Sequence, residues 1–282
     1  MKAECSVCFR HCRLEEGQTG ACFARKNENG KVISENYGKL TAIALDPIEK
    51  KPLRRFYPGS RILSVGSYGC NLKCPFCQNV DISLADGEEL FEPVRQVSPE
   101  ELSDISAAHQ KEGNIGVAFT YNEPLIGFEF VRDTARLIHE RGMKNVLVTN
   151  GCASLSVFEE IAPFIDAMNI DLKCFQREYY EKTLQGDFEM VKAFIREAVR
   201  VCHVEITTLV VPWDNDEEEE MRTLFSWLQD VGREAGKEIP LHLTRFFPRS
   251  RYAHRKPTDV KRVYELAEMA REYLQYVYEG NC

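Results

Sequence analysis

Short apolar runs alternate with longer segments of helical period over most of the chain from Arg61 onward. The runs are rich in β-branched residues and are short, which is typical of buried strands. The six predicted strands cover residues 61–67, 114–120, 145–150, 167–172, 204–211 and 240–246. The predicted helices lie between them, within residues 98–113, 128–142, 154–164, 188–200 and 214–236. Strands that alternate with helices of this length predict a parallel sheet built from βαβ units.

Local signals mark several of the predicted helix ends. Ser98, Pro99 and Glu101 have the order of an N-cap, a proline at the first helical position and an acid in the first turn. Gly113 and Gly142 occupy positions where C-terminal caps are expected. Six strand and helix units predict an α/β fold of the incomplete-barrel type.

The first part of the chain has a different character. Residues 1 to about 46 are rich in Cys, Gly and Asn, and the sequence NENGK at 27–31 predicts a hairpin turn. A proline-punctuated connector follows, and Pro58 with Gly59 interrupts both helix and strand. We therefore expect two parts, a Cys-rich module with its connector at 1–58 and a barrel at 59–282.

Composition restricts location and partners. The 282 residues are 44% hydrophobic and 28% charged, as in globular proteins, and no apolar run approaches the length of a membrane span or signal peptide. A cytoplasmic protein is expected, in which eleven cysteines indicate metal binding or chemistry rather than disulfides. A net charge of −8 argues against binding to nucleic acid. Two basic patches, 50–55 and 249–256, are either solvated or dock an acidic electron carrier.

Chemistry-bearing residues follow the predicted strands. The first strand precedes Cys70, the second TYNEP at 120–124, the third TNG at 149–151 and the fourth Asp171 and Lys173. The carboxyl ends of parallel strands in an α/β barrel form one mouth, where catalytic groups gather. We expect these segments to share that mouth.

Three cysteines in GCNLKCPFCQN are the most specific of these signals. Cys70, Cys74 and Cys77 lie in one loop after a strand. Thiolates are the usual ligands of iron-sulfur clusters, and three of them leave one iron of a 4Fe-4S cluster open for chemistry. A zinc site completed by a distant ligand is the alternative.

The motif CNLKCPFC resembles the cluster loop of the radical S-adenosylmethionine (SAM) enzymes. This resemblance implies a partial (β/α)6 TIM-like barrel of radical SAM type, with a 4Fe-4S cluster held by Cys70, Cys74 and Cys77. It also implies that SAM chelates the fourth iron, and that Phe76 lies beside the cofactors. Reductive cleavage of SAM would release methionine and a 5′-deoxyadenosyl radical that abstracts hydrogen from a substrate.

Other segments carry the resemblance further. TYNEP stands where these enzymes have Gly-Gly-Glu-Pro, so that Asn122 and Glu123 would face the methionyl ammonium of SAM. The segments TNG and DLK resemble those of glycyl-radical activating enzymes such as pyruvate formate-lyase activating enzyme. This resemblance implies that two sets of residues contact SAM. These are Thr149, Asn150 and Gly151 in the first, and Asp171 and Lys173 in the second. Over nearly the whole chain, the sequence most resembles the radical SAM component of the AmmeMemoRadiSam system.

A second cysteine array lies near the start of the chain. Cys5, Cys8, Cys12 and Cys22 provide four thiols within eighteen residues, enough for a closed tetrahedral site. Structural zinc, an auxiliary iron-sulfur cluster and uncoordinated thiols remain open alternatives.

His242 lies on the sixth predicted strand, where alternation places it in the barrel lumen with Thr244. Two roles are open for His242 at this position: contact with the substrate, or packing in the core alone. The sequence thus predicts a radical SAM enzyme in which Cys70, Cys74, Cys77, Lys173 and His242 act in catalysis. The expected electron donor is a flavodoxin or ferredoxin. The substrate is a protein or peptide, or alternatively a small metabolite, while a non-enzymatic metal-binding scaffold is the alternative from another class.

Overall fold

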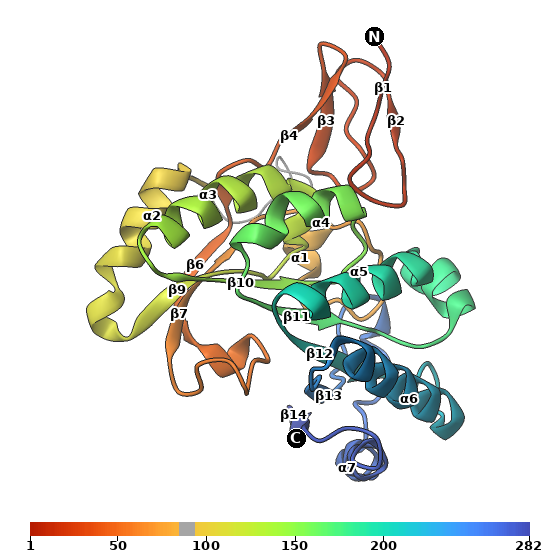
Figure 1. Ribbon diagram of the computed structural model, residues 1–282. Coiled ribbons are helices and arrows are strands. Elements are labelled where there is room, and N and C mark those ends of the chain that lie inside the picture. The colour runs from red at the N-terminus through yellow and green to blue at the C-terminus, as the bar shows by residue number, and fades with distance from the viewer. Residues whose placement is uncertain (85–93) are drawn as a thin grey trace.

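The computed structural model describes residues 1–84 and 94–282, and an open sheet of eight strands forms its centre (Figure 1). The strand order is β14-β13-β12-β11-β10-β9-β7-β6, and every neighbouring pair is parallel except β6 with β7. The strands are β6 (Ala42–Pro47), β7 (Arg61–Gly66), β9 (Asn114–Phe119), β10 (Lys144–Thr149), β11 (Ala167–Asp171), β12 (His203–Val210), β13 (Leu241–Arg245) and β14 (Val277–Gly280). The predicted α/β fold with a partial barrel is confirmed.

Helices connect the parallel strands and pack on the sheet. The α-helices are α1 (Val80–Ser83), α2 (Pro99–Ala108), α3 (Phe128–Glu140), α4 (Leu155–Ile161), α5 (Phe188–Val201), α6 (Glu218–Ala235) and α7 (Val260–Ala270). A π-helical turn, η5, covers Tyr179–Leu184, and the 3-10 turns are η1 (Ile48–Lys50), η2 (Gln110–Glu112), η3 (Pro124–Gly127), η4 (Ala162–Phe164) and η6 (Ser250–Tyr252). All six predicted strands and all five predicted helices are present. Helix α7 and strand β14 were not predicted.

The predicted helix signals are confirmed in part. Ser98 forms a capping box with Glu101 at the start of α2, and Gly142, with a left-handed φ of 69°, lies just after the end of α3. Helix α2 already ends at Ala108, and Gly113, with a φ of 87°, caps the 3-10 turn η2 instead. The core faces of the helices bury large side chains such as Phe194 in α5 and Phe225 in α6, which are fully shielded from solvent. Each such side chain contributes roughly 1.5–3 kcal/mol to stability.

The Cys-rich module projects above one edge of the sheet (Figure 1). It contains two antiparallel pairs, β1 (Ala3–Glu4) with β2 (Arg13–Leu14) and β3 (Arg25–Glu28) with β4 (Lys31–Ser34). The tight turn at Asn29 and Gly30 joins β3 to β4, as predicted from NENGK. Two further short strands, β5 (Lys39–Leu40) and β8 (Arg95–Gln96), pair with each other.

The boundary expected between residues 58 and 59 does not separate the two parts in space. Strand β6 precedes it in sequence but pairs with β7 along its full length. The connector then packs against the sheet, where its Leu53 and Phe56 share an apolar cluster with strand residues such as Val146, and where the Asn169 side chain donates to the Pro52 carbonyl at 2.9 Å. Residues 42–58 therefore belong structurally to the sheet, because their hydrogen bonds are made with its strands.

Glu205 fastens this connector to the sheet. Its fully buried carboxylate accepts hydrogen bonds from the backbone N–H groups of Arg54 and Arg55, at 3.0 and 2.7 Å. The imidazoles of His203 and His242 lie 2.9 and 2.6 Å from the same carboxylate. Burial alone would raise the pKa of Glu205, but these hydrogen bonds hold the pKa at about 2.

Replacing Glu205 with Ala is expected to lower the free energy of unfolding by about 3–5 kcal/mol, because four donors lose a buried acceptor. Chemical denaturation at pH 7 measures the change. Replacing the exposed Glu238 with Ala serves as the control and should change stability by less than about 0.5 kcal/mol. Because the pKa of Glu205 is lowered on folding, its contribution is present above about pH 4.5 and is lost as the pH falls toward 2. Equal stability of the two variants would contradict this role.

Candidate active site

The cysteine loop begins directly after β7, at the carboxyl edge of the sheet. Cys70, Cys74 and Cys77 are all free thiols, and Cys74 is buried. Backbone hydrogen bonds shape the loop: the Leu72 N–H donates to the Cys70 Sγ at 3.4 Å, and the Cys77 N–H donates to the Cys74 carbonyl at 3.3 Å. Three thiols are thus presented by one ordered segment.

Glu123 connects the loop after β9 with the loop after β10. Its carboxylate accepts from the Thr149 hydroxyl at 2.7 Å and from the Asn150 N–H at 2.8 Å. The residue is 3% exposed, and burial raises the pKa of Glu123 to about 7 although these hydrogen bonds favour the charged form. A buried carboxylate of this kind is suited to receive a ligand cation.

Asn122 lies next to Glu123 but has a different environment. Its side-chain oxygen accepts from the Ser67 N–H at 3.0 Å, and its amide nitrogen donates to the Tyr68 and Gly69 carbonyls at 3.1 and 3.2 Å. The structure therefore engages Asn122 with the segment that leads into Cys70. Both of its polar atoms are occupied there.

Tyr121 stands at a position where the resembling motif has glycine, and its backbone has a conformation that favours glycine. Its φ angle is 73°, in the left-handed region that costs a non-glycine residue energy. The Tyr121 hydroxyl donates to the Asp46 carboxylate at 2.8 Å, and the Lys51 ammonium lies 4.6 Å from the centre of its ring. These contacts offset the backbone strain.

Lys173 and Asp171 follow β11 and form an ion pair of 2.9 Å. Burial alone would lower the pKa of Lys173, but the charge of the Asp171 carboxylate holds that pKa above its ordinary range. The Lys173 ammonium also lies 6.0 Å from the centre of the Phe76 ring, within the cysteine loop. The Lys173 cation therefore lies near the part of the loop that carries Cys74 and Cys77.

Asparagine side chains join the cysteine loop to the TNG segment. The Asn150 amide donates to the Asn71 side-chain oxygen at 2.9 Å and lies 3.7 Å from the Cys70 Sγ. The Asn71 amide donates to the Cys152 carbonyl at 2.8 Å. Gly151 has a φ of 68°, which suits the tight turn after β10.

Sequence reasoning missed three residues that hold these segments in place: Asn71, Tyr180 and Asn215. The Lys173 N–H donates to the Tyr180 hydroxyl at 3.1 Å, and the Asn215 amide donates to the Lys173 carbonyl at 2.6 Å. Asn71 directly follows a predicted ligand, which could have drawn attention to it. Tyr180 and Asn215 carry no such signal because they are distant in sequence from the residues they support.

The donor set fits an iron-sulfur cluster. Three thiols from one loop leave one iron of a cubane without a protein ligand, whereas a structural zinc site is closed by four protein ligands. Zinc requires its thiolates to converge at about 2.3 Å from one centre, whereas a cluster binds each thiolate through a different iron. Three adjacent thiols with a nearby cation and a buried carboxylate suit a cluster with one exchangeable iron.

Comparison with known proteins agrees with this geometry. Residues 64–225 match the family model of the Radical SAM superfamily. The chain belongs to the radical SAM superfamily. It is therefore an enzyme of the radical SAM class, and its cofactors are a 4Fe-4S cluster and SAM.

Several relatives show how far the likeness extends. An uncharacterized protein of Methanocaldococcus jannaschii is 37% identical over 99% of this chain and 81% of its own length. Pyruvate formate-lyase-activating enzyme of Clostridium pasteurianum is 28% identical over 66% of this chain and 76% of its own length. Among solved structures, SuiB of Streptococcus suis has a TM-score of 0.58 at 15% identity, covering 77% of this chain and 48% of that one. The last comparison concerns the fold alone.

His242 lies on the face of the sheet that carries Glu205, and its side chain is already engaged there. It is 5% exposed, its Nε2 contacts Glu205 and its ring stacks on Tyr278 with centroids 5.2 Å apart. These contacts explain His242 as a structural residue, and the predicted contact with substrate stays a prediction.

Cys152 and Cys174 are fully buried, and burial raises the pKa of both thiols.

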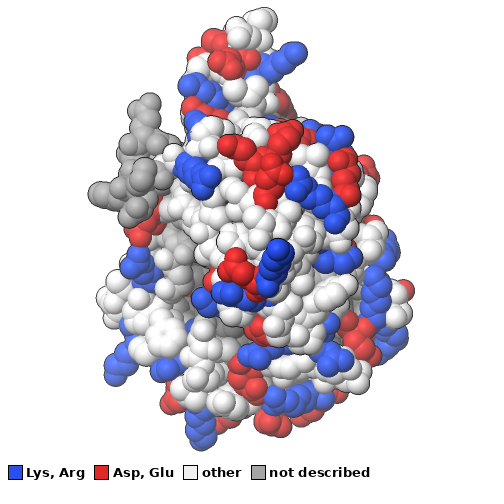
Figure 2. Space-filling view, turned by 90° about the vertical axis from the view of Figure 1, so that its left-hand side faces the viewer, with Lys and Arg blue, Asp and Glu red and all other residues white. Residues whose placement is uncertain are grey.

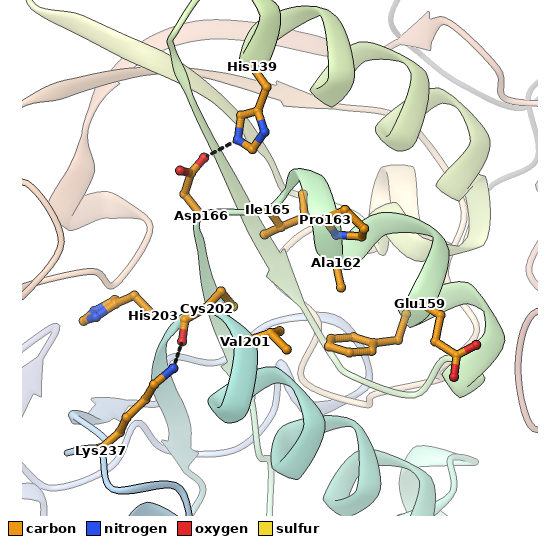
Figure 3. A pocket seen from close by; sticks show the side chains of 11 residues that line it. His139, Glu159, Ala162, Pro163, Ile165, Asp166, Val201, Cys202, His203 and Lys237 are labelled. Carbon is orange, nitrogen blue, oxygen red and sulfur yellow. Dashed lines mark hydrogen bonds and ion pairs between the residues drawn. The ribbon is translucent and has the colours of Figure 1, made fainter.

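A separate hollow of about 960 Å³ lies near the amino-terminal ends of β11 and β12 (Figure 3). Two pairs of its polar groups are already engaged: His139 Nε2 lies 2.7 Å from Asp166, and the Lys237 ammonium donates to the Cys202 carbonyl at 3.2 Å. Catalytic groups of α/β barrels gather at the opposite, carboxyl-terminal ends. This hollow is distinct from the candidate active site.

The surface in Figure 2 carries basic and acidic side chains interspersed, without a continuous area of one sign. The two predicted basic patches differ in their surroundings. Lys51 of the first is 3% exposed and paired with Asp46 at 3.0 Å, whereas Arg251 of the second is exposed and donates to the Lys73 carbonyl in the cysteine loop. Within the described ranges, no helix is long and apolar enough to cross a membrane.

Gly69, which precedes Cys70, allows the loop to approach the Cys-rich module. Its φ is 86°, and a Cβ atom there would lie 2.4 Å from the Cys22 carbonyl oxygen. Replacing Gly69 with Ala is expected to displace the loop and sharply reduce reconstituted iron. Gly59 is the matched control, since its φ is 80° but a Cβ would meet nothing within 4 Å. Its Ala variant should lose about 1–2 kcal/mol of stability and keep its iron. Equal iron contents in the two variants would contradict the packing argument.

Proposed function

We propose that this enzyme cleaves SAM reductively and abstracts hydrogen from a protein or peptide substrate. One observation supports this proposal most strongly. The loops after β7, β9, β10 and β11 lie at the same edge of the sheet, and together they carry three thiols, a buried carboxylate and a buried cation. When bound, the reduced cluster supplies the electron that splits SAM into methionine and a 5′-deoxyadenosyl radical. The chain holds and orients both cofactors.

Each residue has a proposed task. Cys70, Cys74 and Cys77 hold the cluster, while the Glu123 carboxylate accepts hydrogen bonds from the SAM ammonium. Lys173 pairs with the SAM carboxylate, and Asp171 holds that cation in place at 2.9 Å. The loops of Thr149, Asn150 and Gly151 position Glu123 and the thiols through the hydrogen bonds described above. Asn122 acts as a positioning residue, because its amide fixes the segment that leads into the cysteine loop.

Two of the similar proteins favour a macromolecular substrate. One of them is named for the activation of pyruvate formate-lyase, itself a protein, and SuiB has been solved with a precursor peptide bound. The relation to the AmmeMemoRadiSam component and a cytoplasmic location stay predictions. A small metabolite is the alternative substrate, and the experiment below separates the two.

A low-potential electron carrier, a flavodoxin or ferredoxin, is the proposed reductant. The basic segment 249–256 supports this because it lies on the cysteine loop: Tyr252 N–H donates to the Pro75 carbonyl at 3.1 Å. An acidic carrier docked on the exposed cations of this segment would stand close to the thiols. The segment at 50–55 offers less, since Lys51 is buried.

Deuterium transfer into 5′-deoxyadenosine tests this proposal. The reduced enzyme with unlabelled SAM is mixed with extracts of the source organism grown in deuterated medium and separated by size. We expect deuterium to appear in 5′-deoxyadenosine with the macromolecular fraction, and protease treatment of that fraction to remove the effect. Transfer from the small-molecule fraction alone would overturn the protein substrate in favour of a metabolite. Absence of 5′-deoxyadenosine in every sample would overturn the enzyme proposal.

A further inference from the structure

The four cysteines of the amino-terminal module surround one enclosed cavity. Cys5, Cys8 and Cys22 are buried and Cys12 is half-buried, and none of them forms a disulfide. The cavity closes over the start of β3 and the side chain of Ile126, which belongs to the barrel. Four thiols in one cavity are a complete ligand set for a metal centre.

Arg25 adds a second, independent observation, because it also lines this cavity. The residue is 5% exposed, and its terminal guanidinium nitrogens pair with the Glu129 carboxylate at 2.8 Å each. Its Nε atom has no hydrogen-bond partner within the described part of the chain. An unsatisfied buried donor costs roughly 1–3 kcal/mol, and a sulfur-bearing anionic group in the cavity would satisfy it.

The unpartnered Arg25 Nε favours a cluster over zinc at this cavity. A cluster brings bridging sulfides in addition to the four thiolates, and these sulfides can accept a hydrogen bond from a buried donor. A zinc ion held by the same four thiols brings no further acceptor.

The two sites are joined by a direct backbone contact. The Cys70 N–H donates to the Cys22 carbonyl at 3.2 Å, so one hydrogen bond links a ligand of each site. The Arg10 Nε donates to the Asn71 carbonyl at 2.8 Å, and the Ser154 N–H donates to the Val7 carbonyl at 2.9 Å. Electron transfer between centres falls steeply with distance, and this contact gives a short covalent and hydrogen-bonded path.

We propose that Cys5, Cys8, Cys12 and Cys22 hold a second 4Fe-4S cluster, which relays electrons to the cluster at Cys70, Cys74 and Cys77. A reduced carrier of the flavodoxin or ferredoxin class gives one electron to the second cluster, which passes from the 2+ to the 1+ state. The same electron then reduces the catalytic cluster from 2+ to 1+, and the second cluster returns to 2+. No bond or proton moves in these steps.

The surface on which the electron carrier would dock lies close to both cysteine sites. The Lys73 ammonium lies 4.3 Å from the centre of the Phe23 ring, next to Cys22, and Arg251 of the basic segment donates to the Lys73 carbonyl. A carrier on this segment would therefore stand beside the second cluster as well as the catalytic loop. The relay rests on the proposed function, whereas the presence of the second cluster does not.

Metal analysis of the full chain, reconstituted without oxygen, tests the cluster. We expect about eight iron and eight sulfide per chain and no zinc, and about four of each in the Cys70→Ala, Cys74→Ala, Cys77→Ala triple variant. Mössbauer spectra of that variant should contain a 4Fe-4S doublet. About four iron with one zinc in the wild type, four iron without zinc, or a triple variant without iron would each overturn the proposal. These readouts do not depend on SAM cleavage, so a failure of the proposed function is recognised separately.

Stopped-flow reduction by flavodoxin tests the relay. Cys12 is the most accessible of the four thiols. Replacing it with Ala should slow reduction of the catalytic cluster at least tenfold, while the catalytic cluster keeps its own iron. The exposed Cys282 is the control, and its Ala variant should be reduced at the wild-type rate. Equal rates in both variants would overturn the relay, while the metal analysis would still decide whether the second cluster exists.

Discussion

Replacing Cys74 with Ala is expected to abolish the catalytic cluster and, with it, the release of 5′-deoxyadenosine from SAM. Cys74 is the buried member of the three thiols, and its loss leaves only two ligands for a cluster that uses three. Burial raises the pKa of its thiol to about 11, although the nearby Lys173 ammonium lowers it. Iron binding must therefore displace a proton at this position. Iron analysis, EPR and quantification of 5′-deoxyadenosine measure the loss.

The Cys282→Ala variant is the matched control for this experiment, because that thiol is exposed at the chain end. It should retain the wild-type EPR signal and cleavage rate. Circular dichroism of the Cys74→Ala protein should be unchanged, since the substitution only removes one sulfur atom from a loop. A Cys74→Ala protein with the catalytic EPR signal and SAM cleavage intact would refute the ligand assignment.

Replacing Glu123 with Gln is expected to weaken SAM binding by roughly 10- to 100-fold at pH 8, in line with the loss of a charge-assisted hydrogen bond. The amide keeps the shape of the side chain but cannot offer a charged acceptor to the SAM ammonium. Equilibrium binding to the reconstituted protein measures the change. The exposed Glu234 provides the control, and its Gln variant should bind SAM as the wild type does.

The pH dependence gives a sharper test of Glu123. Because burial raises the pKa of this carboxyl to about 7, a large fraction is protonated at neutral pH before SAM binds. SAM affinity of the wild type should therefore fall as the pH is lowered below about 7, approaching tenfold per unit. In the Gln variant this dependence should disappear. Identical pH profiles would exclude Glu123 as the group that receives the ammonium.

The parts of the fold that sequence predicted are those set by local pattern. Apolar runs define the six central strands, and Ser98 with Glu101 sets the start of α2 through bonds made within four residues. The three cysteines of the catalytic loop were likewise recognised because they lie within eight residues of each other. Patterns this short need no knowledge of the remaining chain.

The parts that could not be predicted depend on distant contacts. Strand β6 is short and directly precedes the proline-punctuated connector, and it joins the sheet because β7 offers an edge for antiparallel pairing. The Arg55 N–H meets Glu205 across 150 positions of sequence, which no local pattern can encode. This pairing also changes the interpretation of His242, whose lumen-facing position was predicted while its carboxylate partner was not.

The candidate site divides in the same way. Glu123, Asp171 and Lys173 were found through motifs at strand ends, whereas the supporting hydrogen bonds of Asn71 required the fold to bring two loops together. Tyr121 illustrates a further limit of prediction from sequence. The sequence shows a tyrosine where the resembling motif has glycine, but it does not show which backbone conformation this tyrosine adopts. In this protein the Tyr121 backbone is left-handed, and its side chain contacts Asp46 and Lys51.

The most direct test of the central claim is made without oxygen on the reconstituted and reduced protein. SAM is added, the EPR signal of the catalytic cluster is recorded, and 5′-deoxyadenosine is quantified in the same sample. We predict a SAM-dependent change of the signal together with 5′-deoxyadenosine release, because SAM occupies the iron that the three thiolates leave open. An intact cluster at Cys70, Cys74 and Cys77 whose signal is unchanged by SAM, without 5′-deoxyadenosine, would contradict the account.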